Sequence, residues 1–408
     1  MVNVLLSKDE QNGEVVIFGA GNIARAFIIS LRETIGLHAL NLVGCMVSNI
    51  YVNAKDIEGV PVYSIDYMSK YHREAKVLIA VKNEYMKSIE NLLIQHGMMN
   101  YRGVDLDECI QVMEVEWKKN TKKAALFEHS FEEGNFSKEE YLMFLGKQLK
   151  RNVLSFEVNF VNHCNLNCQC CNHFSPLAKA SFLDKYKYAS DLKRIHELFG
   201  NRIGRLMLLG GEPLLHPEIE ELLQITRDNL PDASLYLITN GLLFSKMSQK
   251  FWRLCNNLRI GIKVTKYPLK FDYAKWERYA LEHGVDLSDE STEPIKTTYR
   301  LPLKENGGLD PYRNYMKCYH ANMCVVLREG RLYTCPIAAW IDILNEYYSK
   351  KFPQLEDNSI DIYQVNNPQE IEDYLKLPIP MCSHCDIFNY KYNIPWSQSK
   401  KSAEEWLD

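Results

Sequence analysis

The feature that most constrains this chain is a short loop with three cysteines, Cys164, Cys168 and Cys171, in the spacing C-x3-C-x2-C. Thiolates this close together can bind one small metal centre and leave a position on it open, as a catalytic centre requires. Thiolate is a soft ligand that suits iron–sulfur clusters. A structural zinc site is an alternative, because His163 or Cys170 offers the fourth protein ligand that it needs, and a disulfide pair is another.

A second motif favours the iron–sulfur interpretation. The apolar stretch 206–209 runs directly into Gly210-Gly211-Glu212-Pro213. Together with the cysteine triad, in this order and spacing, it resembles the radical S-adenosylmethionine (radical SAM) superfamily over about residues 153 to 261. The resemblance implies that the three cysteines hold a 4Fe–4S cluster, whose fourth iron takes the amino and carboxylate groups of SAM.

The same resemblance assigns roles to the residues around the SAM position. The two glycines permit close backbone approach, and the Glu212 carboxylate is expected to meet the ammonium of SAM. Thr239 and Asn240 lie where the family contacts the ribose or the methionyl end of SAM, although a plain strand-end turn is an alternative. Cys170 replaces the aromatic residue that the family usually has there, and we interpret it as a small apolar filler.

Alternating strand and helix patterns surround these motifs. Strands are predicted within 155–161, 206–209, 234–242 and 258–268, with a helix over 190–199. Such units indicate an α/β fold, and the resemblance implies the partial (β/α)6 barrel of the family, with the cluster loop leaving the carboxyl end of its first strand. Lys263, Lys266 and Tyr267 are then expected at the substrate side of the barrel mouth, unless they are ordinary polar residues of a strand end.

The first part of the chain predicts a separate parallel sheet of Rossmann type. A buried strand, Val15–Phe18, turns through Gly19 and Gly21 into an amphipathic helix, in a G-x-G-x-x-A pattern whose helix N-terminus can cradle a phosphate. Further strand and helix patterns follow at 42–47, 77–81 and 85–96. This alternation is typical of a Rossmann-like domain.

Nucleotide binding by that domain is not favoured. An NAD site requires an acidic residue near the end of the second strand, and no carboxylate follows Val47 before Asp56. The stretch up to about Arg102 resembles small Rossmann-like domains attached to enzymes of polysaccharide and nucleotide-sugar biosynthesis. We therefore expect a docking or dimerisation module, through which the chain can form a homo-oligomer.

A second set of cysteines lies in the C-terminal third. Cys318, Cys335, Cys382 and Cys385 resemble the ligands of an auxiliary 4Fe–4S cluster in radical SAM enzymes, with a hairpin turn at Glu329-Gly330 between the first two. The short twitch version fits better than the longer SPASM version, because no cysteine follows Cys385. A four-thiolate zinc site is the alternative. Cys324 remains as an alternative ligand, a hydrogen-atom donor or a buried small side chain.

These patterns divide the chain into four parts. We predict a Rossmann-like domain at 1–110, a helical linker at 111–151 with a helix that packs on the barrel, the radical SAM barrel at 152–310 and a twitch-type auxiliary-cluster subdomain at 311–408.

Composition limits the partners and the compartment. The charges nearly balance, with 48 basic and 52 acidic side chains, so neither nucleic acid nor an anionic membrane is an expected partner. The sequence has no basic-then-apolar signal pattern at Met1–Glu10 and no apolar run long enough to span a bilayer. Its 12 cysteines then indicate reduced thiols and metal in a cytoplasmic protein.

The resemblance implies that SAM is cleaved reductively to a 5′-deoxyadenosyl radical, which removes a hydrogen atom from the substrate. An electron donor such as flavodoxin or ferredoxin is then required. Twitch enzymes with this ligand spacing act on sugar-like alcohols, so we expect a sugar-like or nucleotide-sugar substrate that is dehydrogenated or epimerised. A peptide-modifying maturase and a zinc-binding scaffold without catalytic activity are the alternatives.

Overall fold

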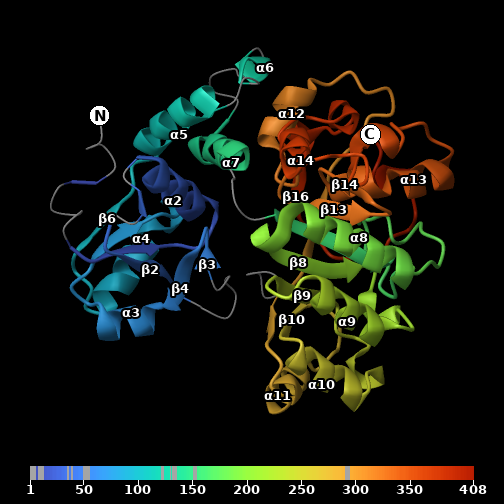
Figure 1. Ribbon diagram of the computed structural model, residues 1–408, viewed down its shortest axis with the longest axis horizontal. Helices are drawn as coiled ribbons and strands as arrows, with labels where there is room; N and C mark the ends of the chain where they lie inside the picture. The colour runs from blue at the N-terminus through green and yellow to red at the C-terminus, as the bar shows by residue number, and fades with distance from the viewer. Residues whose placement is uncertain are drawn as a thin grey trace. The chain divides into compact units, whose positions relative to one another are not determined.

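The computed structural model describes residues 6–7, 13–34, 36–37, 40–48, 56–120, 124–128, 130, 136–149, 154–289 and 295–408. The chain forms two compact units, Met1–Asn152 and Val153–Asp408, which are described one at a time (Figure 1). Both cysteine sets identified above belong to the second unit.

The first unit is built on a mainly parallel sheet with the order β3-β4-β2-β1-β5-β6. Its strands are β1 (Val15–Phe18), β2 (Leu42–Val47), β3 (Asp56–Ile57), β4 (Val60–Ser64), β5 (Lys76–Ile79) and β6 (Tyr101–Gly103). All neighbouring pairs are parallel except β3 with β4. The central strand β1 is entirely apolar and buried, as expected for a strand covered on both faces. A parallel sheet is therefore confirmed, whereas the Rossmann-like identity of the domain stays a prediction.

Helix α2 (Asn22–Thr34) follows β1 through the predicted glycine turn. Gly19 has a φ of +129°, and a Cβ there would lie 2.6 Å from the carbonyl oxygen of Ala80. Only glycine permits both the backbone conformation and this approach to the end of β5. Helices α3 (Ile65–Tyr71) and α4 (Asn83–Gln95) complete the strand–helix alternation.

The predicted linker is instead part of the first unit. It contains α5 (Leu106–Asn120), α6 (Ala125–Glu128) and α7 (Lys138–Leu149), and α7 packs against α2 and α5. The rings of Trp117 and Phe144 meet edge to face, with centroids 5.2 Å apart, in the buried contact between α5 and α7. Within the first unit the apolar face of α7 is covered by α2 and α5, and the prediction that this helix packs on the barrel stays a prediction.

The second unit contains a larger sheet with the order β11-β10-β9-β8-β7-β13-β14-β15. Its strands are β7 (Leu154–Val161), β8 (Ile203–Gly210), β9 (Ser234–Thr239), β10 (Ile260–Val264), β11 (Leu287–Asp289), β13 (Val325–Arg328), β14 (Arg331–Tyr333) and β15 (Ser359–Asp361). From β11 through β7 to β13 every neighbouring pair is parallel. The parallel sheet is confirmed, and its description as a partial (β/α)6 barrel stays a prediction.

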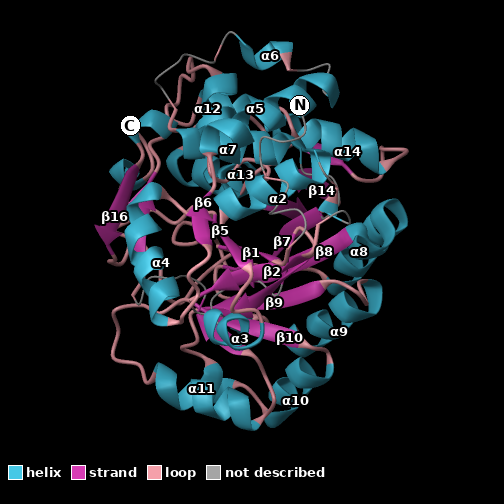
Figure 2. Cartoon of the chain, turned by 90° about the vertical axis from the view of Figure 1, so that its left-hand side faces the viewer, coloured by secondary structure: helices cyan, strands magenta, loops and turns pink. Residues whose placement is uncertain are grey.

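Helices follow the strands of this sheet and cover one of its faces. They are α8 (Lys185–Phe199), α9 (Ile219–Asn229), α10 (Gln249–Asn257) and α11 (Tyr273–Glu282). Figure 2 shows α8, α9 and α10 in a row beside strands β8 to β10. Their apolar faces join the strands in one core, where Tyr188, Leu222 and Trp252 are almost fully buried. This packing leaves the carboxyl ends of the strands, with their loops, to form a site.

The C-terminal part continues the same sheet. Strand β13 pairs with β7 and forms the predicted hairpin with β14, where Glu329 and Gly330 both have positive φ. The other elements are α12 (Pro311–Lys317), α13 (Pro336–Tyr348), α14 (Pro368–Leu375) and the antiparallel pair β12 (Thr297–Arg300) with β16 (Lys391–Pro395). The boundary predicted between 310 and 311 therefore does not separate two compact units.

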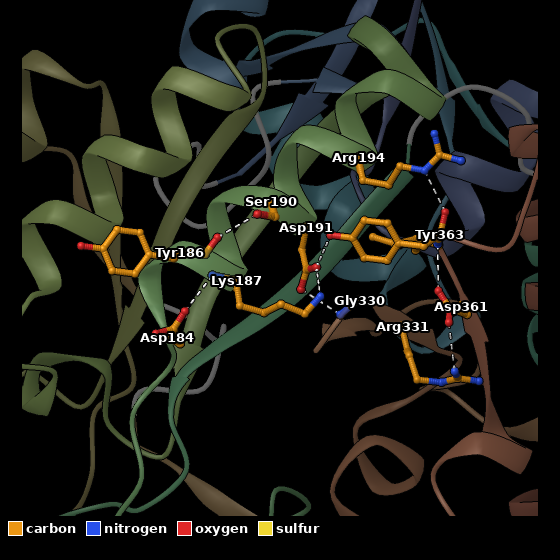
Figure 3. A network of polar contacts seen from close by, with 11 residues as sticks. Asp184, Tyr186, Lys187, Ser190, Asp191, Arg194, Gly330, Arg331, Asp361 and Tyr363 are labelled. Carbon is orange, nitrogen blue, oxygen red and sulfur yellow. Dashed lines mark hydrogen bonds and ion pairs between the residues drawn. The ribbon is translucent and has the colours of Figure 1, made fainter.

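A buried carboxylate ties helix α8 to this C-terminal part. Asp191 accepts hydrogen bonds from the ammonium of Lys187 at 2.5 Å, the hydroxyl of Tyr363 at 2.7 Å and the backbone N–H of Gly330 at 2.8 Å (Figure 3). Arg194, one turn further along α8, donates to the carbonyl oxygens of Ile362 and Val365. Polar contacts from one helix thus hold the hairpin turn and the segment after β15.

Candidate active site

The two sequence motifs meet at the carboxyl ends of β7 and β8. A Cβ on Gly211 would lie 2.0 Å from the carbonyl oxygen of His163, and one on Gly210 would lie 2.4 Å from that of Val161. The N–H groups of Gly211 and Glu212 donate to the carbonyl oxygens of Val161 and His163, at 2.7 and 3.1 Å. The glycine pair is therefore required because the cysteine loop lies directly against its backbone.

A cavity of about 290 Å³ opens between these strand ends. All three cysteines of the predicted triad line it, together with Gly210, Gly211, Thr239 and Asn240. The other lining residues are Glu157, Gln169, Cys170, Asn172, His173, Ser175, Leu209, Ile238, Thr265, Tyr267, Lys296, Thr298, Tyr299, His320, Cys324 and Pro336. The structure thus brings two motifs that are far apart in the sequence to one cavity.

Glu212 does not line this cavity. Its carboxylate is 1% exposed and accepts hydrogen bonds from the Thr239 hydroxyl at 2.6 Å and from the N–H groups of Asn240 and Leu214, both at 3.0 Å. Burial raises the pKa of Glu212 to about 7, against the effect of these three donors. The carboxylate is satisfied inside the protein, where it joins the ends of β8 and β9, and its contact with the SAM ammonium stays a prediction. Pro213 follows it in a short, buried 3₁₀ turn that is also outside the cavity lining.

Thr239 and Asn240 are held by this arrangement. Asn240 also donates from its side chain to the side-chain oxygen of Asn165, at 2.8 Å, and accepts from the N–H of Leu242 at 3.0 Å. The end of β9 is thereby linked to the cysteine loop as well as to Glu212. Both residues border the cavity as predicted, and their contact with SAM stays a prediction.

Of the three polar residues predicted at the substrate side, only Tyr267 lines the cavity. Lys266 forms an ion pair with Glu277 at 2.8 Å, and the ammonium of Lys263 lies over the ring of Tyr236. Neither lysine lines the cavity, because the ammonium of Lys266 is held by Glu277 and that of Lys263 by the ring of Tyr236. Lys296, which no sequence pattern distinguished, lines the cavity instead.

The second cysteine set also converges. Cys318, Cys335, Cys382 and Cys385 line a separate, small cavity of about 20 Å³ beneath α12 and the end of β14. The Asn314 side chain donates to the carbonyl oxygens of Cys382 and Cys385, at 2.8 and 2.7 Å, which fixes that turn. The buried hydroxyl of Thr334 borders the same cavity and has no hydrogen-bond partner. Four thiols and a hydroxyl without a partner fit a group with sulfur or oxygen acceptors.

Cys324 belongs to the first cavity and not to the second. Its thiol donates a hydrogen bond to the buried carboxylate of Glu157, on β7, and burial followed by this neighbour raises the pKa of the thiol well above its usual range. Its use as a ligand of the auxiliary site is therefore not supported by its position. The residue lines the first cavity, and its role as a hydrogen-atom donor stays a prediction.

The thiols of Cys164 and Cys168 are largely protonated in the absence of a metal. Burial raises the pKa of Cys164 to about 12, and it raises the pKa of Cys168 in spite of the hydrogen bond that the sulfur accepts from Trp396. Metal binding must therefore release protons from this loop. Among the described residues, no three His, Cys, Asp or Glu side chains are arranged to hold a single metal ion. Each cysteine set nevertheless lines a cavity, and the binding of a four-iron cluster by either set stays a prediction.

Several cavity residues carried no signal in the sequence. Asn172 and His173 directly follow the third cysteine, so their position in the motif was the only clue. Tyr299 and His320 come from segments with no recognisable pattern, and Asn172 donates to both, at 2.9 Å to the hydroxyl and at 3.4 Å to the ring.

In the part of the chain that the structure describes, no helix is both long and apolar enough to cross a membrane.

Comparison with known proteins finds similarity over the residues that contain the cysteine triad and the glycine pair. A family model described as the radical SAM superfamily matches residues 158–269. GTP 3′,8-cyclase of Aliarcobacter butzleri is 31% identical over 100 residues, which cover 24% of this chain and 31% of that protein. Probable GTP 3′,8-cyclase of Methanococcus aeolicus is 20% identical over 256 residues, which cover 60% of this chain and 84% of that protein. The match thus spans about a third of the first relative's length.

Among solved structures, the crystal structure of BtrN in complex with AdoMet and 2-DOIA is 17% identical to this chain, with a TM-score of 0.38. The match covers 58% of this chain and 94% of that one.

Proposed function

We propose that this chain, which contains a radical SAM superfamily domain, is an enzyme that cleaves SAM reductively and removes a hydrogen atom from a sugar-like or nucleotide-sugar substrate. The net reaction would be a dehydrogenation or an epimerisation. The observation that carries the proposal is the single cavity lined by Cys164, Cys168, Cys171, the glycine pair and the end of β9. Bound there, a 4Fe–4S cluster and SAM supply an electron and a 5′-deoxyadenosyl radical.

The chain's own residues have three tasks in this proposal. The cysteine loop, held against Gly210 and Gly211, offers three thiolates at one end of the cavity. Thr239 and Asn240, fixed by Glu212, present polar groups to SAM. The remaining cavity wall orients the substrate and limits access of water to the reacting atoms.

The character of that wall supports a hydroxyl-rich substrate. Glu157, Asn172, Thr298, Tyr299 and His320 all line the cavity, so its wall contains both donors and acceptors of hydrogen bonds. Neutral amides and hydroxyls recognise hydroxyl groups, and Glu157 can accept a hydrogen bond from one.

Cys324 distinguishes the two reactions. In an epimerisation, the substrate radical must receive a hydrogen atom from the face opposite to the one that lost it, and the thiol that lines the cavity can supply that atom. The sulfur radical left on Cys324 then takes one electron from the external electron donor and one proton, which restores the thiol. In a dehydrogenation, the radical instead loses one electron and one proton. We propose that the second cysteine set holds a further 4Fe–4S cluster that passes electrons, because four protein thiols leave no iron for the substrate.

A nucleotide cyclase is a second candidate. The relatives with significant similarity are named GTP 3′,8-cyclases, although the first of them matches over only 31% of its length. A peptide maturase and a zinc-binding scaffold remain as alternatives of other classes. Nucleotide sugars, GTP and short peptides therefore belong in one substrate screen.

The decisive experiment measures iron, sulfide and zinc after anaerobic reconstitution, together with 5′-deoxyadenosine formed under a reductant. We expect roughly eight irons per chain for two four-iron clusters. The variant Cys164→Ala should lose all SAM cleavage, whereas Cys45→Ala, on β2 of the other unit, should keep it. Zinc in place of iron, with no 5′-deoxyadenosine, would establish the scaffold instead.

Once a substrate is known, the variant Cys324→Ala distinguishes an epimerisation from a dehydrogenation. If the enzyme is an epimerase that uses this thiol, the variant should still cleave SAM but lose the epimerised product. Solvent deuterium should appear in the product of the unmodified enzyme. An unchanged yield of an oxidised product in the variant would instead identify a dehydrogenase.

A further inference from the structure

The end of the chain lies along the cysteine loop. After β16, the carbonyl oxygen of Ser397 accepts a hydrogen bond from the N–H of Gln169 at 3.0 Å, and the N–H of Ser399 donates to the carbonyl oxygen of Asn167 at 2.7 Å. Cys168 and Gln398 form an antiparallel bridge between these two bonds. Segments more than 200 residues apart in the sequence are thus joined through their backbones at the loop that carries the triad.

Within this contact, one side chain reaches a cysteine sulfur. The indole N–H of Trp396 donates to Sγ of Cys168 at 3.1 Å. The ring of Trp396 also packs edge to face on that of Tyr267, with centroids 5.5 Å apart, and the Tyr267 hydroxyl donates to the same sulfur. Cys168 is therefore the member of the triad with two side-chain donors in the described residues, and one of them comes from the C-terminal segment.

A second tryptophan fixes the far end of this segment. The indole N–H of Trp406 donates to the carbonyl oxygen of Cys171 at 3.0 Å, and its ring is buried. The Glu405 carboxylate accepts from the N–H of Cys170 at 3.4 Å and from that of Lys400 at 2.7 Å. These contacts hold the chain after Trp396, and the pairing of β16 with β12 holds it before Trp396, which keeps the indole in a defined position.

We propose that the C-terminal segment 396–408 acts as a strap that sets the reduction potential of the first cluster, through the hydrogen bond from Trp396 to Cys168. This inference rests on the proposed function, because it concerns the cluster that the triad would hold. Reduction places more negative charge on the thiolate sulfurs, and a donor aimed at one of them stabilises the reduced form more than the oxidised form. Hydrogen bonds to sulfur ligands are a known determinant of cluster potentials.

The indole is well suited to this task. It donates but does not accept, and it has no proton to lose in the physiological range, so its effect on the sulfur does not change with pH. Its partner Tyr267 lines the cavity, where a substrate can disturb it, whereas Trp396 is outside the cavity lining. Trp396 is therefore a positioning residue that acts on the cluster through Cys168.

The test is a redox titration of the reconstituted full-length chain, followed by electron paramagnetic resonance. The first cluster is identified as the one whose signal changes when SAM is added. Trp396→Phe keeps an aromatic ring against Tyr267 but removes the donor, so the potential of this cluster should become more negative. A tenfold loss in the relative stability of the reduced form corresponds to about 59 mV for one electron.

Trp406→Phe is the matched control. It removes an indole donor from the same strap, but that donor bonds to a backbone oxygen and not to a sulfur. The reduction potential of the first cluster in Trp406→Phe should equal that of the unmodified chain. Circular dichroism and iron content verify that both variants are folded and contain their clusters. Equal potentials for Trp396→Phe and the unmodified chain would overturn the proposal. If the unmodified chain holds no cluster at all, it is the proposed function that fails.

Discussion

At the scale of single residues, Glu212 shows how a motif residue can serve a site from outside it. Its three hydrogen bonds connect β8, β9 and the turn after Gly211, and two of its partners, Thr239 and Asn240, line the cavity. The motif therefore needs a carboxylate, because one group must accept from a hydroxyl and from two backbone N–H groups at once.

The raised pKa of Glu212 predicts a pH dependence of stability. The group titrates near 4.5 in an unfolded chain and at about 7 in the folded one, so the folded chain binds more protons between these values. Its contribution to stability should thus fall as the pH rises from about 4.5 to about 7. We expect the free energy of unfolding of the unmodified chain, relative to Glu212→Gln, to decrease across this window.

Denaturant unfolding of the metal-free chain and of the Gln variant, at several pH values, measures that difference. Glutamine cannot titrate and presents an amide to one of the N–H donors, so Glu212→Gln should also weaken SAM binding by about tenfold or more. A difference that does not vary with pH would show that Glu212 stays ionised in the fold.

At the scale of elements, Asp191 joins α8 to the hairpin of β13 and β14 (Figure 3). The hairpin lies beside β7, the strand that leads into the cysteine loop. The contact of Asp191 with the hairpin turn therefore helps to position β7 and the cysteine loop that follows it.

Asp191→Ala should lower the free energy of unfolding by about 2 to 4 kcal/mol, because it leaves the N–H of Gly330 and the hydroxyl of Tyr363 without an acceptor. Glu197→Ala, on the same helix, removes only a half-exposed ion pair with Arg194 and should change stability by less than about 0.5 kcal/mol. Denaturation followed by circular dichroism compares the two. Equal effects of both variants would show that the Asp191 network has no special role.

At the scale of the whole molecule, the chain forms two compact units, and every predicted ligand of both metal sites belongs to Val153–Asp408. That unit has its own sheet and its own core. These are the properties of a part that can fold alone.

A fragment comprising residues 153–408 should therefore fold cooperatively and take up the same amount of iron as the full chain. Thermal unfolding followed by circular dichroism, together with iron analysis after reconstitution, tests this expectation. A fragment that aggregates or binds no iron would show that the first unit is required for the fold of the second. A folded fragment without activity would instead assign the first unit a role in catalysis or substrate delivery.

Much of this organisation could be predicted from local patterns. The strands β1, β2 and β9, the hairpin of β13 and β14 and the two cysteine sets all follow from periodicity, turn residues or spacing within short stretches. The packing partners of the 111–151 segment could not be predicted. The pattern of an amphipathic helix shows that one face must be covered, but it does not show which elements cover that face. The predicted positions of Lys263 and Lys266 were wrong for a similar reason, since the partners that hold their ammonium groups, Tyr236 and Glu277, lie on other elements.

The sequence by itself determined the chemistry that this chain can support: three thiolates in one loop, a glycine pair that lets the loop approach, and four further cysteines near the C-terminus. Those features are local, and the residue types alone establish them. Only the tertiary structure decided that Glu212 bonds to Thr239 and Asn240, that Cys324 lines the cavity beside Glu157, and that Trp396 reaches Cys168. These contacts join segments distant in the chain, and they depend on how the strands are ordered and where the final segment lies.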